Sequence, residues 1–237
     1  ARNVVATSQP LAAQAGLQML ARGGNAVDAA LAAAITLAVV EPTSNGIGSD
    51  AFALVWDGTE LHGLNGSGRS PLAWTPARFA ARSSMPLQGW DAVTVPGAVD
   101  AWASLSRKFG KLPFVDLFEF AIRYASDGFI VSPITAEKWS LTPKQFRDFP
   151  VFAATFLPGD RSPLPGELFR PQGMADTLKI LAQTGGESLY RGELAARIVS
   201  HAQETGGTMT AEDLSGHRSE WVRPLSQDWH GVTLYEL

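Results

Sequence analysis

An Ala-rich apolar segment, Ala26–Val40, is the feature that most constrains the fold of this chain. Two glycines and Asn25 precede it, and Glu41-Pro42 ends it. Because Asn25 is a good N-cap, the pattern predicts a helix that begins directly after it. At about 15 residues, the segment is shorter than the roughly 20 that a membrane-spanning helix needs. Small side chains on almost every face predict a helix buried among several neighbours in a soluble core.

Composition sets the limits within which this helix must pack. The chain has 237 residues, 45% of them hydrophobic, and a formal net charge of -4. Such a chain can bury a substantial core as one large domain or two small ones, which excludes a disordered or fibrous protein. The absence of cysteine from the sequence excludes a disulfide framework, a thiol nucleophile and a thiolate metal site. Slight acidity without a basic block argues against nucleic acid as a partner.

The N-terminal residues predict a short strand and a helix. Residues 4–7 are rich in β-formers, and Ser8 is the expected N-cap of a helix with Pro10 in its first turn. We expect this helix to end at residues 22–24, where glycine can adopt the left-handed conformation. Residues 1–10 lack a charged region followed by an apolar one, so no signal peptide is expected in this chain.

A β-hairpin is expected next, over Ala51–Trp56 and residues 60–64, with Asp57-Gly58 as its turn and at least one buried strand. Residues 93–97 predict a third short strand broken by a turn. Helical spacing predicts four more helices, over Ala98–Phe109, 114–125, 176–183 and 192–205. Residues 210–213 form a capping box that begins a short helix, and residues 232–235 are a final β-rich run.

The titratable residues suggest no familiar catalytic group. The histidines have no metal-ligand spacing, and none lies beside a Ser-centred nucleophile turn, so surface or structural roles are expected for His62, His201, His217 and His230. Asn25 and Asp28 are expected to be a helix cap and a buried hydrogen-bonding carboxylate. The sequence therefore predicts neither a metal site nor a Ser-His-Asp triad.

Two glycine-punctuated loops are the most unusual segments. Residues 44–50 and 65–71 combine glycine with small hydroxyl or amide side chains beside predicted strands. Such loops can place backbone amides against an anionic or amide-containing ligand. The alternative for residues 44–50 is a tight turn at which a helix packs on the sheet.

Several separated motifs resemble the γ-glutamyltranspeptidase family in order and spacing. The motifs are Gly-Gly-Asn-Ala-Val-Asp-Ala-Ala at 23–30, Val-Glu-Pro at 40–42, Gly-Ile-Gly at 46–48, Val-Pro-Gly at 95–97, Ala-Ser-Asp-Gly-Phe at 125–129, Tyr-Arg-Gly at 190–192 and Gly-Gly-Thr-Met-Thr-Ala-Glu-Asp-Leu at 206–214. The resemblance covers essentially the whole chain.

The resemblance implies an α+β fold, the αββα sandwich of the N-terminal nucleophile hydrolases. Members of this family are precursors that cleave themselves, and the smaller C-terminal subunit then begins with a threonine nucleophile whose α-amine can serve as general base. Residues 1–237 would thus form a single domain, an incomplete N-terminal subunit that has no catalytic residue of its own. Its expected partner is the small subunit, and no cofactor is implied.

A substrate-binding loop is implied after the hairpin. Family members that bind γ-glutamyl donors pair the donor's α-carboxylate with an arginine that Glu and Ala-Pro follow, and a guanidinium fork suits that role. Aligned on Pro71, this chain has Ser67 in place of the arginine and Gly68 in place of the glutamate, while Arg69 comes two residues later. Ser67 and Arg69 are the candidate substrate-binding residues. The alternative for Arg69 is a surface or interdomain salt bridge.

The expected activity is transfer or hydrolysis of γ-glutamyl amides, such as glutathione. The changed loop is similar to the cephalosporin-acylase-like branch of the superfamily, so an amidohydrolase of glutaryl groups is the alternative. A scaffold that has lost catalysis is the third possibility. The family's members are commonly periplasmic, secreted or surface-bound, and the sequence itself leaves the localisation of this protein unknown.

Overall fold

The chain divides into two compact units, each of which is described by itself. The computed structural model describes residues 2–146 and 148–237. Unit 1 contains Ala1–Gly46 and Gly110–Gln183, and unit 2 contains Ile47–Phe109 and Thr184–Leu237. The expectation of a single domain stays a prediction.

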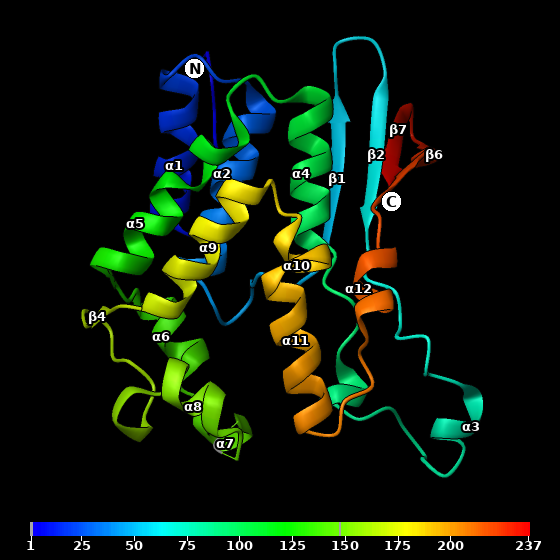
Figure 1. Ribbon diagram of the computed structural model, residues 1–237. Helices are drawn as coiled ribbons and strands as arrows, with labels where there is room; N and C mark the ends of the chain where they lie inside the picture. The colour runs from blue at the N-terminus through cyan, green and yellow to red at the C-terminus, as the bar shows by residue number, and fades with distance from the viewer. Residues whose placement is uncertain (1, 147) are drawn as a thin grey trace. The chain divides into compact units, whose positions relative to one another are not determined.

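Unit 1 is built mainly of helices (Figure 1). These are α1 (Pro10–Ala21), α2 (Ala26–Val40), η2 (Phe114–Phe118), α5 (Glu119–Asp127), α6 (Pro133–Trp139), α7 (Thr142–Phe146), α8 (Pro150–Phe156), η3 (Pro158–Asp160) and α9 (Gln172–Thr184). A small antiparallel sheet joins β3 (Phe129–Ile130) to β4 (Leu168–Phe169). The helix predicted over residues 114–125 is in fact η2 followed by α5.

Helix α2 is the centre of unit 1, as its sequence predicts. It packs against α1, η2 and α5, and Leu31, Ile35 and Val39 are at most 2% exposed. Its N-terminus carries a capping box in which Asn25 Oδ1 accepts from Asp28 N at 3.0 Å, and Asp28 Oδ2 accepts from Asn25 N at 2.8 Å. Among the described residues, no helix is long and apolar enough to cross a membrane.

The N-terminal predictions need two corrections. Residues 4–7 run extended but form no strand, and the N-cap of α1 is Gln9 rather than Ser8. The Gln9 side chain bonds the orphan amides of the first turn itself, accepting from Leu11 N at 2.5 Å. Ser8 instead donates its hydroxyl to the carboxylate of Glu41, a side chain that is almost fully buried and needs donors.

Unit 2 combines a sheet with helices. Its elements are β1 (Ala51–Trp56), β2 (Leu61–Gly66), α3 (Pro76–Phe79), η1 (Trp90–Ala92), α4 (Ala98–Phe109), α10 (Ser188–Arg191), α11 (Glu193–Glu204), α12 (Ala211–Gly216), β5 (Glu220–Val222), β6 (Leu225–Trp229) and β7 (Val232–Glu236). The hairpin and helix α4 lie where the sequence predicts them. Strands β1, β2 and β5 form an antiparallel sheet in that order.

The two faces of this sheet are covered differently. Helix α4 packs against β1 and β2 (Figure 1), and Leu64 of β2 is fully buried. The alternate residues of β1 point to the other face, where Phe52, Leu54 and Trp56 are 59%, 42% and 64% exposed. A strand that is apolar on both sides is therefore half-buried on one side and exposed on the other within the described residues, so β1 is not the buried strand that the sequence predicts.

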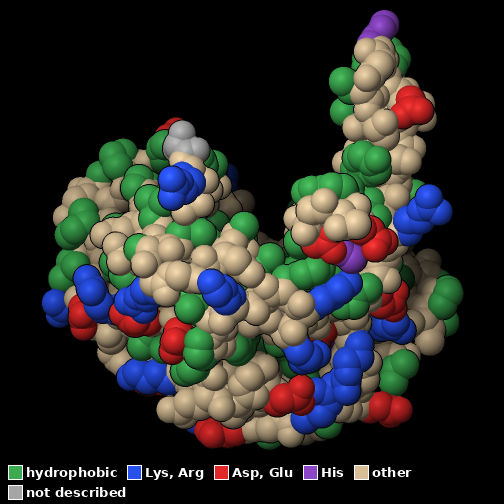
Figure 2. Space-filling model, turned by 90° about the horizontal axis from the view of Figure 1, so that it is seen from above, with side chains coloured by type: hydrophobic (Ala, Val, Ile, Leu, Met, Phe, Trp, Pro, Cys, Tyr) green, Lys and Arg blue, Asp and Glu red, His purple; other side chains and the backbone are tan. Residues whose placement is uncertain are grey.

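The β6–β7 ribbon is amphipathic and pairs as a separate two-stranded sheet. Register places Trp229 opposite Val232 and Leu234 opposite Gln227, so these apolar side chains share one face with Leu225. All four are more than half exposed. Figure 2 shows the ribbon as a narrow arm that projects from the surface, with a histidine at its tip.

The strand predicted over residues 93–97 is wrong. Val95 N donates to Arg69 O at 2.9 Å, whereas Gly97 N donates to Ser49 O at 3.1 Å. Pro96 between them has no N–H to donate. Because the backbone bonds go to two different loops, no ladder forms, and the segment is a turn that leads into α4.

Candidate functional site

Three loops of unit 2 meet where β1 begins, β2 ends and α4 begins. The carbonyl of Ser49 accepts from Gly97 N at 3.1 Å and from Ala98 N at 2.8 Å. The carbonyl of Arg69 accepts from Val95 N at 2.9 Å. The two glycine-punctuated loops therefore both contact the turn at residues 95–98, the first through residues 47–50 and the second through residues 66–69.

Glycine is required here for close backbone contact. A Cβ atom on Gly68 would lie 1.7 Å from the Val95 carbonyl oxygen, and one on Gly97 would lie 1.9 Å from that of Gly66. Neither distance is compatible with a side chain. The glycines of residues 65–71 thus have a packing reason that does not depend on a ligand.

Side chains fix the backbone of the candidate substrate-binding loop, residues 67–69. Asn65 Oδ1 accepts from Ser67 N at 2.9 Å, forming an Asx turn. Asp50 Oδ1 accepts from Gly68 N at 2.7 Å. The loop therefore has a defined conformation, and its three residues lie at the surface or only partly below it.

Arg69 forms an ion pair with Glu220 of β5. Its Nη2 lies 2.5 Å from Glu220 Oε1, with the two side chains 68% and 56% exposed. Glu220 is opposite Asn65 in the β2–β5 register. The salt bridge anticipated as the alternative role is thus present within unit 2. A guanidinium has five N–H donors, so this contact leaves donors for a second carboxylate.

A buried layer supports the turn at residues 95–97. Tyr190 Oη donates to the Pro96 carbonyl at 2.8 Å and accepts from Asp100 N at 3.0 Å. Asp100 Oδ2 in turn accepts from Ser219 N at 2.6 Å. Burial raises the pKa of Tyr190, so the hydroxyl keeps its proton and remains a donor.

His217 lies against this layer. Its ring stacks on Tyr190 at 5.4 Å between centroids and 20° between planes, and only 1% of the residue is exposed. Neither ring nitrogen has a hydrogen-bond partner among the described residues. Burial lowers the pKa of His217, which favours the neutral ring. A structural role, as the sequence predicts, suits this environment.

The remaining histidines lie elsewhere. His62 Nε2 is 2.8 Å from Asp57 Oδ2 at the hairpin turn, and this hydrogen bond lowers the pKa of Asp57 to about 2. His201 lies beside Trp90, with 5.9 Å between ring centroids, and His230 occupies the turn between β6 and β7. Within residues 2–146 and 148–237, no group of three His, Cys, Asp or Glu residues could hold a metal ion.

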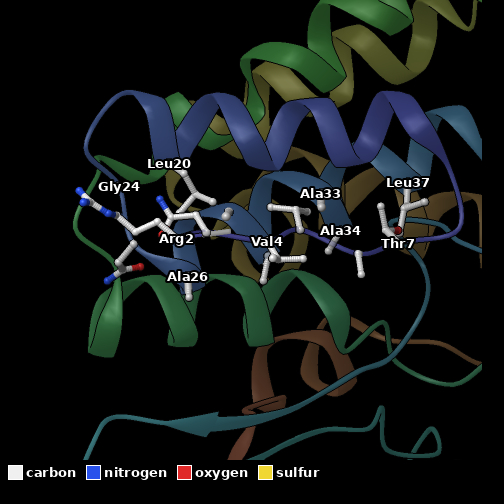
Figure 3. A pocket seen from close by; sticks show the side chains of 15 residues that line it. Arg2, Val4, Thr7, Leu20, Gly24, Ala26, Ala33, Ala34 and Leu37 are labelled. Atoms are coloured by element: carbon white, nitrogen blue, oxygen red, sulfur yellow. The ribbon is translucent and has the colours of Figure 1, made fainter.

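A hollow of about 570 Å³ in unit 1 offers different chemistry. It lies between the extended N-terminal residues and helix α2, and its wall is formed by small apolar side chains such as Ala26, Ala33 and Ala34 (Figure 3). Arg2 is the charged residue among those that line it. Because the lining holds no carboxylate or imidazole that could serve as acid or base beside Arg2 and the Thr7 hydroxyl, we place the candidate site in unit 2.

Comparison with known proteins decides the family. A family model described as Gamma-glutamyltranspeptidase matches residues 12–237. The chain belongs to the γ-glutamyltranspeptidase family. The resemblance seen in its motifs is therefore confirmed.

Relatives of known name or structure include hydrolases and acylases. The chain is 39% identical to the glutathione hydrolase-like YwrD proenzyme of Bacillus subtilis, over 99% of this chain and 45% of that protein. A cephalosporin acylase from Bacillus halodurans is 48% identical, with a TM-score of 0.94 over 99% of this chain and 47% of that one. The Helicobacter pylori γ-glutamyltranspeptidase is 28% identical, with a TM-score of 0.94 over 99% of this chain and 69% of that one. These structures confirm the α+β nucleophile-hydrolase fold.

This chain spans less than half of the length of the curated relatives it matches, from 45% of the YwrD proenzyme to 33% of glutathione hydrolase 7 of Mus musculus. The fold and family follow from the matched part. Activity and partners of the whole protein are proposals.

The sequence alone does not indicate several of the contacts that shape the site. Asp50, Glu220 and Tyr190 all contact the loops, yet each is separated from its partner by between 18 and 151 residues. Asp50 has one local signal of a role at the site, because it is a carboxylate directly before a predicted strand. No local pattern indicates Glu220, because its role depends on the pairing of β5 with β2.

Proposed function

We propose that this chain is the N-terminal portion of an enzyme that transfers or hydrolyses γ-glutamyl amides, such as glutathione. The observation that carries the proposal is the fixed loop that presents Arg69 in a chain of the γ-glutamyltranspeptidase family. A guanidinium recognises the planar α-carboxylate of a γ-glutamyl group through paired hydrogen bonds. Ser67, on the same loop, is the second proposed binding residue.

The reaction itself requires a nucleophile from outside these residues. We propose a threonine at the start of a C-terminal small subunit, released by self-cleavage of a precursor. Its hydroxyl attacks the amide carbonyl while its own α-amine takes the proton, and the amide C–N bond then breaks as the amine leaves with that proton. Water or an acceptor amine next attacks the acyl-enzyme, and the acyl–oxygen bond breaks to release the threonine hydroxyl. The chain described here supplies orientation of the acyl group, and alone it is inactive.

The exposed face of the β1–β2 sheet supports a partner of this kind. Phe52 and Trp56 are more than half exposed, and such apolar faces are typical of contact surfaces. In a sandwich of two sheets, the second sheet covers this face. We propose that the small subunit supplies it.

A glutaryl amide is the second candidate substrate class. A cephalosporin acylase is 48% identical to this chain. A glutaryl group keeps a carboxylate at the position of the γ-glutamyl α-carboxylate and lacks only the α-amino group, so both substrate classes can pair with Arg69, whose present partner is Glu220.

The decisive experiment compares γ-glutamyl and glutaryl p-nitroanilides on the full-length protein. We expect Arg69→Ala to raise KM for the γ-glutamyl compound by about 10- to 100-fold, because a hydrogen-bonded charge contributes about 1.5–3 kcal/mol. Arg197→Ala is the matched control, since Arg197 is equally exposed and ion-paired, to Glu193.

Equal KM values for wild type and Arg69→Ala would refute the role of Arg69. Preference for the glutaryl compound would favour the second candidate. Intact-mass measurement and N-terminal sequencing of the full-length protein test the reaction class. If no second chain begins with threonine, the acyl-transfer mechanism is refuted and the scaffold hypothesis is favoured.

A further inference from the structure

Asp50 lies at the open end of the β1–β2 hairpin, directly before β1. Register places Ala51 opposite Gly66, so the Asp50 side chain faces the residues that leave β2. Its Oδ1 accepts from Gly68 N at 2.7 Å. Hydrogen bonds to an ionised acceptor are roughly twice as strong as neutral ones. We propose that Asp50 is a positioning residue that holds residues 67–69 so that Arg69 is presented to the acyl donor.

The residues around the Asp50 carboxylate leave room for its hydrogen bond to Gly68 N. A Cβ atom on Gly97 would lie 3.2 Å from Asp50 Oδ1, and one on Gly68 would lie 3.1 Å from it. Glycine at both positions therefore gives the carboxylate its room. The N-terminus of the 12-residue helix α4 lies here too, since Ala98 N and Gly97 N donate to the Ser49 carbonyl. The positive end of the helix dipole favours a carboxylate at this place.

The contact matters because it fixes the peptide next to Arg69. The amide of Gly68 is bonded to Asp50, and the carbonyl of Arg69 is bonded to Val95 N. Both sides of the Gly68–Arg69 linkage are thereby held. Without the Asp50 carboxylate, Gly68 regains the wide φ/ψ freedom of glycine, and displacements of about 1 Å are enough to reduce productive binding strongly.

This inference rests on the proposed role of Arg69, and it extends that role to a residue that touches no substrate. It differs from direct recognition of a substrate ammonium by Asp50. A positioning role needs an oxygen that accepts from Gly68 N, whereas ammonium recognition needs the negative charge. Asparagine keeps the oxygen and loses the charge, so it separates the two.

The test uses the full-length protein with Asp50→Ala, Asp50→Asn and, as a control for charge, Glu212→Gln at an exposed position. We expect Asp50→Ala to raise KM for γ-glutamyl p-nitroanilide by about tenfold, with kcat within twofold. KM for valeryl p-nitroanilide, whose acyl chain has a methyl group in place of the carboxylate, should be unchanged. Asp50→Asn and Glu212→Gln should resemble the wild type. Loss on both substrates with Asp50→Ala, or equal loss with Asp50→Asn, would overturn the positioning role.

A double variant and hydrogen exchange keep the two proposals distinguishable. With Arg69→Ala already present, Asp50→Ala should add nothing to KM. Amide exchange in residues 67–69 should accelerate in Asp50→Ala and not in Glu212→Gln, whether or not the protein turns over substrate. Unchanged exchange overturns the role of Asp50 alone. An Arg69→Ala variant with wild-type KM overturns the proposed function of Arg69 and, with it, the purpose assigned to Asp50.

Discussion

Unit 1 and unit 2 bury their apolar side chains to different extents. In unit 1, most of helix α2 is buried, and Leu31 and Ile35 are 2% and 0% exposed. In unit 2, β1 is equally apolar in sequence, yet Phe52 and Trp56 are 59% and 64% exposed. Unit 1 thus completes much of its core within this chain, whereas the sheet of unit 2 has a face suited to a further layer. Apolar sequence alone predicts burial without saying what covers it.

The largest effect is expected from the Asp28 carboxylate, which joins the start of α2 to the amides of residues 111 and 112 in unit 1. Asp28 is fully buried and accepts from Lys111 N at 3.0 Å and from Asn25 N at 2.8 Å. Asp28→Ala would leave these part-buried amides without their partner and a cavity at a fully buried position, and should lower the free energy of unfolding by about 3–5 kcal/mol. Urea denaturation followed by circular dichroism measures this. Asp176→Ala, at a side chain 62% exposed, is the control, and an equally small effect for both would contradict the interpretation.

Substitutions on the exposed face of unit 2 should act on association with a partner rather than on the core of the chain itself. If the proposed small subunit covers this face, Phe52→Ser and Trp56→Ser should each weaken its association by about 1.5–3 kcal/mol, measured as the urea midpoint at which the two chains of the full-length protein separate. Leu141→Ser in unit 1 is the control, because Leu141 is 65% exposed. If β1 faced solvent in the assembled protein, all three changes would stay within about 0.5 kcal/mol.

A smaller, pH-dependent effect is expected from His217. Its pKa is lowered by burial, while Asp100 and Asp50 act to raise it, and Arg69 and Arg191 to lower it. Because the unfolded chain binds this proton more readily, stability should fall as pH drops below about 6.5, with a slope of at most about 1.4 kcal/mol per pH unit. Melting temperatures from pH 8 to 5 test this, and His217→Phe should flatten the curve over that range. A curve of unchanged slope in the variant would exclude His217 as the source.

The smallest effect concerns a surface ion pair of unit 1. Arg22 Nη1 lies 2.5 Å from Glu119 Oε2, with side chains 39% and 49% exposed, and this contact lowers the pKa of Glu119. A double-mutant cycle with Arg22→Ala and Glu119→Ala should give a coupling energy of about 0.5 kcal/mol that declines in 1 M salt. A coupling above about 2 kcal/mol would show that this pair is more protected from solvent than its exposure indicates.

Local signals predicted much of this fold. The successful predictions all involve neighbours in sequence: the Asn25 N-cap, the capping box at Thr210, the hairpin turn at Asp57-Gly58 and the helix over Ala98–Phe109. Predictions failed where distant partners decide the outcome. Ser8 caps no helix because Glu41 takes its hydroxyl, and residues 93–97 form no strand because their bonds go to two loops.

The candidate site follows the same pattern. Arg69 and Ser67 were found on a loop with a recognisable glycine pattern, and their binding role stays a prediction. Glu220 was not found, because it lies 151 residues away and reaches Arg69 only through the β2–β5 register. Asp50 was noticed as part of a loop, whereas its contact with Gly68 depends on the hairpin register.

The Asp28 carboxylate also has a consequence for the order of events during synthesis. It joins the start of α2 to amides that come 83 and 84 residues later, and the first segment of unit 2, Ile47–Phe109, lies between them. As the chain leaves the ribosome, α1 and α2 are complete long before the residues that satisfy this carboxylate appear. Helix α2 is therefore synthesised but only partly packed while the first segment of unit 2 is made. We expect nascent chains that stop before Lys111 to need chaperones, and those that extend beyond residue 183 to need them less.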